Sequence, residues 1–154
     1  MLKKTFTLVL FLFLSSCGYE AIHSKKNIIN YDFYISGVSF EGDRDVNLKI
    51  KEKLNNYTLN KKNKIFTLKI SSTTEKVTLL KNISGDATSY KSVITVNIQV
   101  LMENITKSNL QIVESFNYNN DTNKFDLKRY EREIKNNLAE TATDKLIFKL
   151  SNIQ

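Results

Sequence analysis

Cys17 is the residue of this sequence best suited to covalent chemistry, because it is the only thiol among 154 residues. It ends the stretch Leu14-Ser15-Ser16-Cys17, which has the pattern of a lipobox. The small residues Ser15 and Ser16 give a peptidase access to the backbone, and the thiolate is the nucleophile that would accept a diacylglycerol as a thioether. The sequence therefore predicts that Cys17 is lipidated.

The residues before Cys17 have the pattern of a cleaved targeting segment. Two lysines precede an apolar run over residues 6–14, which is too short for a bilayer that needs about 20 apolar residues. We expect residues 1–16 to be a lipoprotein signal peptide, and an ordinary signal peptide with a chance cysteine is the alternative. Gly18 stands where lipoproteins of the inner membrane usually carry Asp. We therefore expect export through the inner membrane and lipid anchoring in the outer membrane, held firmly if several acyl chains are attached.

The other polar residues do not form a pattern typical of an enzyme. His23 is the only histidine and follows the lipid site closely, so a triad with a nucleophile would have to be built in that segment. Glu131, Glu133 and Glu140 lie among lysines and arginines, as on a solvated helix face. The sequence has no GxGxxG phosphate loop and no cluster of acidic and histidine residues with metal-ligand spacing. We expect no enzyme activity, no cofactor and no metal.

The charge of the chain is basic, at +7, and removal of the signal peptide with its two lysines lowers it by two. An exported protein meets phosphorylated lipids and acidic glycans, so we expect no nucleic-acid partner. The alternative is that the scattered lysines only keep the surface soluble. A single cysteine also excludes an intramolecular disulfide, so the fold must be stabilised by its core.

The remaining sequence indicates a tether over residues 17–30 and one domain over residues 31–154. Residues 31–40 alternate as a strand with a bulge at Ser36-Gly37, and Asp43 or Asp45 is expected to cap a helix carrying Val46, Ile50, Leu54 and Tyr57. The further elements are a strand around residues 66–79, a turn at 84–86, a central strand over 90–100, a turn at 104–109, an edge strand over 110–118 and a helix capped by Asp126, with Tyr130 in its apolar stripe, that ends near residue 150.

This order, β-α-β-β-β-α, predicts an α+β fold. A strand, one helix and a second strand within a short stretch favour a right-handed crossover, so the first two strands should be parallel. Each amphipathic helix must bury its apolar stripe. We therefore expect a two-layer sandwich with two helices packed on one face of a four-stranded mixed sheet.

The mature chain resembles the LptE family of lipopolysaccharide-assembly lipoproteins, whose members sit inside the LptD β-barrel of the outer membrane. The resemblance covers the mature chain and rests on the order of elements and on these residues: Cys17-Gly18-Tyr19, Ser84-Gly85, Tyr90, Thr95-Val96-Asn97, Val100-Leu101, Glu133-Ile134, Ala142 and Lys145 to Leu150. It implies a lipoprotein that plugs an LptD-like barrel, helps that barrel to assemble and contacts lipopolysaccharide.

The resemblance also implies which residues make those contacts. In the family, basic residues near a hairpin and at the start of the last helix are implicated in lipopolysaccharide contact, and the matching positions are Lys81 and Lys128, with Lys76, Lys91 and Arg129 nearby. Lysine and arginine bind phosphate as charge-assisted donors. The hairpin residues Ser84, Gly85 and Asp86 are the matching candidates for barrel contact. Ordinary surface lysines and a solvated turn are the alternatives.

A second kind of protein fits the same features. A periplasmic accessory lipoprotein of a lipid-transport ABC system, or another outer-membrane assembly factor, could have the same anchor and a small α+β domain. Such a protein would never enter a barrel.

Overall fold

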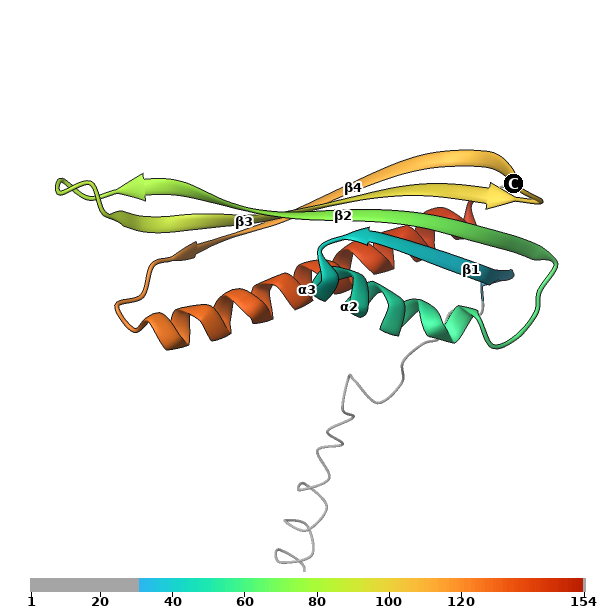
Figure 1. Cartoon of the computed structure of the whole chain (residues 1–154), viewed down its shortest axis with the longest axis horizontal. Helices are drawn as coiled ribbons and strands as arrows, with labels where there is room; N and C mark the ends of the chain where they lie inside the picture. Colours follow the sequence, from blue (N-terminus) through green and yellow to red (C-terminus); the bar gives the residue numbers. More distant parts are fainter. Residues whose placement is uncertain (1–30, 154) are drawn as a thin grey trace, which may run out of the picture. The chain divides into compact units, whose positions relative to one another are not determined.

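The computed structural model describes residues 31–153, so the predicted signal peptide, Cys17, the tether and His23 lie outside the described residues. The elements, in chain order, are β1 (Phe33–Gly42), α2 (Arg44–Leu54), the short 3₁₀ helix η1 (Asn55–Tyr57), β2 (Lys64–Lys81), β3 (Ala87–Met102), β4 (Ile105–Asn119) and α3 (Lys124–Ser151) (Figure 1). The predicted order β-α-β-β-β-α is confirmed.

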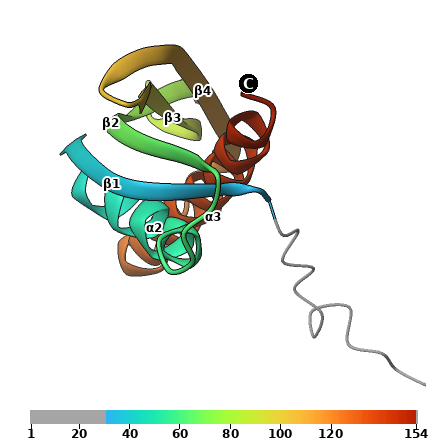
Figure 2. The ribbon, with the colours of Figure 1, turned by 90° about the vertical axis from the view of Figure 1, so that its right-hand side faces the viewer.

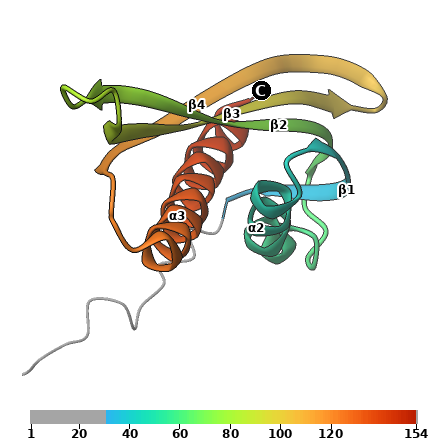
Figure 3. The same ribbon diagram turned by 60° about the vertical axis from the view of Figure 1, so that its left-hand side comes forward.

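The four strands form one mixed sheet in the order β1-β2-β3-β4. β1 runs parallel to β2, whereas β2, β3 and β4 form an antiparallel meander. The predicted parallel pair, the central position of β3 and the edge position of β4 are confirmed. Figure 2 shows the twist of the sheet from β1 to β4, and Figure 3 shows α2 and α3 on the same side of it. The α+β fold with two helices on one sheet face is therefore observed.

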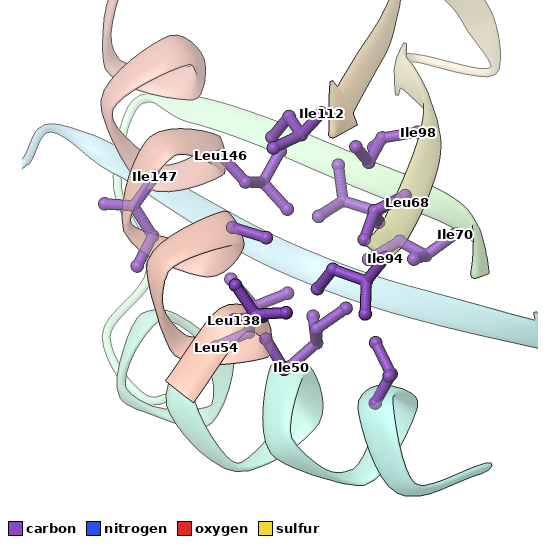
Figure 4. Close-up of a cluster of buried hydrophobic side chains, with 14 of the residues drawn as sticks. Ile50, Leu54, Leu68, Ile70, Ile94, Ile98, Ile112, Leu138, Leu146 and Ile147 are labelled. Carbon is purple, nitrogen blue, oxygen red and sulfur yellow. The ribbon is translucent and has the colours of Figure 1, made fainter. Parts of the chain in front are cut away.

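The core lies between the sheet and the two helices. Figure 4 shows Ile50 and Leu54 of α2 and Leu138 and Leu146 of α3 pointing toward strand residues such as Ile94. The fully buried side chains also include Phe66, Ile35, Leu68, Ile70, Ile98, Leu150, Val46 and Val96. Burial of each such side chain contributes about 1.5–3 kcal/mol. These are the residues whose recurrence at every second position indicated strands, and at every fourth position indicated helices, in the sequence.

The crossover from β1 to α2 is fixed by three polar or small residues. Ser36 occupies the predicted bulge, where its hydroxyl donates to the Phe66 carbonyl over 3.1 Å. Gly42 has φ +89°, and a Cβ at this position would lie 1.9 Å from the carbonyl oxygen of Ser72. Asp43, not Asp45, caps α2, and its carboxylate accepts from the N–H groups of Asp45 and Val46.

Two predicted boundaries at the sheet edge and at α3 are wrong. β4 begins at Ile105 because Glu103 and Asn104, with φ of 52° and 64°, make a two-residue turn instead of a loop over 104–109. Positive φ at both residues is typical of a type I′ hairpin. The cap of α3 is Asn123, and the predicted cap Asp126 lies in the first turn.

Tyr130, which was predicted to belong to the apolar stripe of α3, is 44% exposed. Its ring packs edge-on against that of Tyr118, with 6.2 Å between the ring centroids. The side chain therefore lies at the margin of the core. This position leaves one side of the ring accessible.

Candidate functional site

The structure does not gather the five predicted cations at one point. Lys76 in β2 and Arg129 in α3 each form an ion pair with a carboxylate of α3. Lys91 alternates with the buried Ser92 in β3, so it belongs to the sheet face that carries no helix. Lys81 is exposed at the end of β2, and Lys128 is exposed on α3. Of these five, Lys128 lines a hollow on the described part of α3 together with two further cations, Arg132 and Lys135.

Lys76 is part of an aromatic and ionic cluster under the sheet. Its ammonium lies 2.6 Å from Glu131 and 3.7 Å from the centroid of the Tyr90 ring. Tyr118 donates its hydroxyl to the same Glu131 oxygen over 2.9 Å. A phosphate at Lys76 would have to compete with Glu131, so this lysine mainly joins β2 to α3.

The Tyr118 phenol is held in its protonated form by this cluster. Partial burial raises the pKa of Tyr118, and the hydrogen bond to Glu131 and the charge of Glu131 raise it further, with a smaller effect of Tyr90. The phenol therefore remains a hydrogen-bond donor throughout the physiological pH range.

A shallow hollow of about 400 Å³ lies on the first turns of α3 and is lined by Phe125, Lys128, Glu131, Arg132 and Lys135. Lys128 and Arg132 are four residues apart and have no carboxylate partner within residues 31–153. Phe125 is 72% exposed beside them. The hollow thus combines two available cations with an aromatic ring, which is the chemistry of an amphiphilic anion site.

Lys135 borders this hollow and connects it to the start of α2. Its ammonium lies 3.1 Å from Asp43 and 3.5 Å from Asp45. Partial burial by itself would raise the pKa of Asp43, but the neighbouring Thr74 hydroxyl, the Val46 N–H and the Lys135 ammonium outweigh it and hold the pKa below its ordinary value. The Thr74 hydroxyl is buried and has no partner among the described residues that meets full hydrogen-bond geometry.

Several polar groups of the turn between β2 and β3 form hydrogen bonds within the turn itself. The N–H of Asp86 donates to the Asn82 side chain over 2.8 Å, the N–H of Asn82 donates to the Asp86 carbonyl, and Gly85 adopts φ +87°. Ser84, Gly85 and Asp86 are exposed, as the barrel-contact prediction requires. Ile83 is fully exposed beside them and was not among the predicted contacts.

Arg132 and Lys135 are the site residues that sequence reasoning missed. Their spacing from Lys128, at four and seven residues, places all three on one helix face. This signal was present in the sequence. The position of Phe125 beside these cations could not be predicted in the same way, because α3 was predicted to begin only at Asp126.

None of the helices in residues 31–153 is long and apolar enough to cross a membrane. No group of three or more histidine, cysteine, aspartate or glutamate side chains in this range could hold a metal ion.

Comparison with known proteins identifies the fold. No protein-family model and no curated protein matches the sequence. The chain is similar in structure to rare lipoprotein B from Shewanella oneidensis, with a TM-score of 0.59, 15% identity, and coverage of 75% of this chain and 93% of the other. It is also similar to a minor lipoprotein from Acinetobacter baumannii, with a TM-score of 0.56, 15% identity and coverage of 79% and 91%.

A third similar structure is uncharacterized lipoprotein B from Nitrosomonas europaea, with a TM-score of 0.52, 12% identity and coverage of 79% and 86%. The fold of this domain is therefore that of solved small bacterial lipoproteins. At such low identity the likeness establishes the arrangement of helices and strands alone.

Proposed function

We propose that this chain is a non-enzymatic outer-membrane lipoprotein that acts in lipopolysaccharide assembly, as plug and assembly partner of an LptD-like β-barrel. The observation that carries the proposal is the α3 hollow, which Lys128 and Arg132 line together with the exposed Phe125. Lipid A presents phosphates next to acyl chains. Two cations would bind the phosphates, and the aromatic ring would cover part of the apolar surface.

The membrane anchor in this proposal is lipid on Cys17, and Gly18 directs the protein to the outer membrane. The lipobox pattern supports the anchor, and the likeness in fold to solved lipoproteins agrees with it. Lipidation would place the basic domain close to lipopolysaccharide, where its charge favours phosphate.

A polar patch on the sheet face opposite α2 and α3 supports the plug role. The face of the sheet without helices carries a depression lined by hydrogen-bonding side chains, among them Lys69, Asn97, Gln99, Asn109 and Gln111. The lumen of a large membrane barrel is polar as well. Amide side chains on both strands, such as Gln111 donating to Asn97 over 3.0 Å, would match such a wall through hydrogen bonds.

The lipopolysaccharide contact is tested by charge reversal in the full chain. We expect Lys128→Glu with Arg132→Glu to weaken binding to purified lipopolysaccharide about tenfold or more at low salt, with a smaller loss near 0.5 M salt because screening already weakens the wild type. Lys81→Glu alone tests the hairpin cation in the same assay.

The matched control is Lys61→Glu with Lys107→Glu. Both lysines are exposed. Lys61 precedes β2 and Lys107 lies near the start of β4, so both are at the end of the sheet away from the β2–β3 hairpin. This control changes the net charge equally. Equal losses in both double variants, with circular dichroism unchanged, would mean that binding follows net charge and would remove the α3 hollow from the proposal.

A further inference from the structure

A second hollow, of about 910 Å³, lies under the end of β4 and beside the first turns of α3. Apart from Arg129, its lining takes no part in the lipopolysaccharide proposal. The aliphatic and aromatic residues that line it are Leu79, Leu80, Phe116, Tyr118, Leu127 and Tyr130. Three of them are large side chains exposed by 44% to 63%, namely Leu80, Phe116 and Tyr130. An apolar surface of this kind, open at a sheet edge, is typical of an interaction site.

The rim of this hollow is acidic, although the protein is basic. Asp121, Asp126 and Glu133 line it together with one cation, Arg129, which is already paired with Asp126 over 3.0 Å. Glu133 is exposed and forms no ion pair within residues 31–153. The hollow is therefore unsuited to phosphate. It favours an apolar ligand that carries positive charge.

Within residues 31–153, the strand above the hollow has a free edge. β4 is the last strand of the sheet, so alternate backbone N–H and C=O groups along it point away from β3. Phe116, Asn117, Tyr118 and Asn119 of this strand all line the hollow. The ion pair of Glu114 with Lys145 lies just before them, and a charge facing inward on an edge strand opposes pairing there. The accessible part of the edge is therefore the last few residues of β4.

We propose that an extended segment of a partner polypeptide adds to the sheet beside Phe116 and the residues after it. Backbone hydrogen bonds to the free edge would hold the segment, as in other cases of strand addition. Every second side chain would point toward α3, and apolar ones would pack on Phe116 and Tyr130. Basic residues of the segment would be attracted to Asp126 and Glu133, which are seven residues apart on α3 and thus separated by about 10 Å.

This inference is independent of the lipopolysaccharide proposal, because the two hollows involve different residues and opposite charge. The probe is a dye-labelled nonapeptide with valine and threonine alternating in the order lysine-lysine-valine-threonine-valine-threonine-valine-lysine-lysine. One control peptide has the same composition with the three valines consecutive. A second control peptide has glutamate in place of every lysine.

We expect the full chain to bind the alternating peptide and not the two controls, as measured by fluorescence anisotropy at low salt. Amide hydrogen exchange should slow at the end of β4 when the peptide is bound. Phe116→Ser and Glu133→Lys should each weaken binding about fivefold or more.

The matched control variants are Val113→Ser and Glu140→Lys. Val113 is 53% exposed on the opposite face of the same strand, and Glu140 is exposed on α3 outside the hollow. Both should leave binding unchanged within about twofold. No binding at about 1 mM peptide, equal binding of the peptide with consecutive valines, or equal losses in the control variants would overturn the proposal. If Phe116→Ser fails to fold, the proposal is tested by comparing peptide binding of Glu133→Lys with that of Glu140→Lys.

Discussion

At the scale of single residues, Asp43 joins three elements of the domain. Its carboxylate caps α2, receives the Lys135 ammonium from α3 and lies beside Thr74 of β2. Its backbone N–H donates to the Ser72 carbonyl over 3.0 Å, and the Ser72 hydroxyl donates to Asn47 over 2.8 Å. One side chain therefore aligns the start of α2 with the sheet and with the basic hollow of α3.

Replacement of Asp43 by Asn keeps an amide oxygen for the cap but removes the charge. Because the pKa of Asp43 is lowered in the folded state, the charge stabilises the fold above the unfolded pKa, and this stabilisation disappears as pH falls through the folded value. We expect Asp43→Asn to cost about 1 kcal/mol at pH 7, and the difference from wild type to shrink below about pH 4. Urea unfolding at both pH values measures this. A difference that grows on acidification would contradict the assignment.

At the scale of elements, the edge strand β4 is held to α3 by an ion pair. Glu114 faces the helix layer with its side chain 12% exposed, and one of its oxygens lies 2.5 Å from the Lys145 ammonium, which is half-exposed. The pair fixes the position of β4 on α3 more than it stabilises the fold, because the cost of removing the carboxylate from water offsets much of the attraction between the charges. It also places a charge on the inner face of an edge strand, where it discourages pairing with other chains.

Removal of one partner should cost more than removal of both. We expect Lys145→Met to lower the free energy of unfolding by about 1–2 kcal/mol, because Glu114 is then nearly buried without a partner. Adding Glu114→Leu should restore most of that loss in urea unfolding. The double variant should self-associate more strongly in light scattering, since the inward charge is gone. A double variant as unstable as the single one would show that the pair is net stabilising.

The sequence was sufficient to predict those elements whose pattern is set by core burial. The alternation around Ile94 and the fourfold spacing of Ile50 and Leu54 predicted β3 and α2, because each buried residue had to face the same layer. The turn at Asn104 was predicted, but its length was overestimated, because it contains no glycine to mark a two-residue hairpin turn. The ion pair of Lys76 was unpredictable, because it depends on how α3 crosses β2.

At the scale of the whole domain, the surface has regions that differ in polarity and charge, namely the two sheet faces and the two hollows. Phe33, where the chain enters the sheet, pairs with Lys64, whereas the hairpin lies at the other end of β2. Eighteen strand residues span about 60 Å. A hairpin tip at the far end of so long a strand suits a protein that reaches along a partner, as the proposed barrel plug would.

The most direct test of the central claim is recovery of the barrel. The full chain, carrying an affinity tag at its C-terminus, is purified from membranes with a mild detergent that preserves outer-membrane complexes. We predict that a large outer-membrane β-barrel co-purifies in equal molar amount, and that Cys17→Ser reduces the recovered complex by removing the anchor. A chain that is purified without any barrel, with its lipid attached and its fold intact, would contradict the plug role and favour a periplasmic accessory lipoprotein.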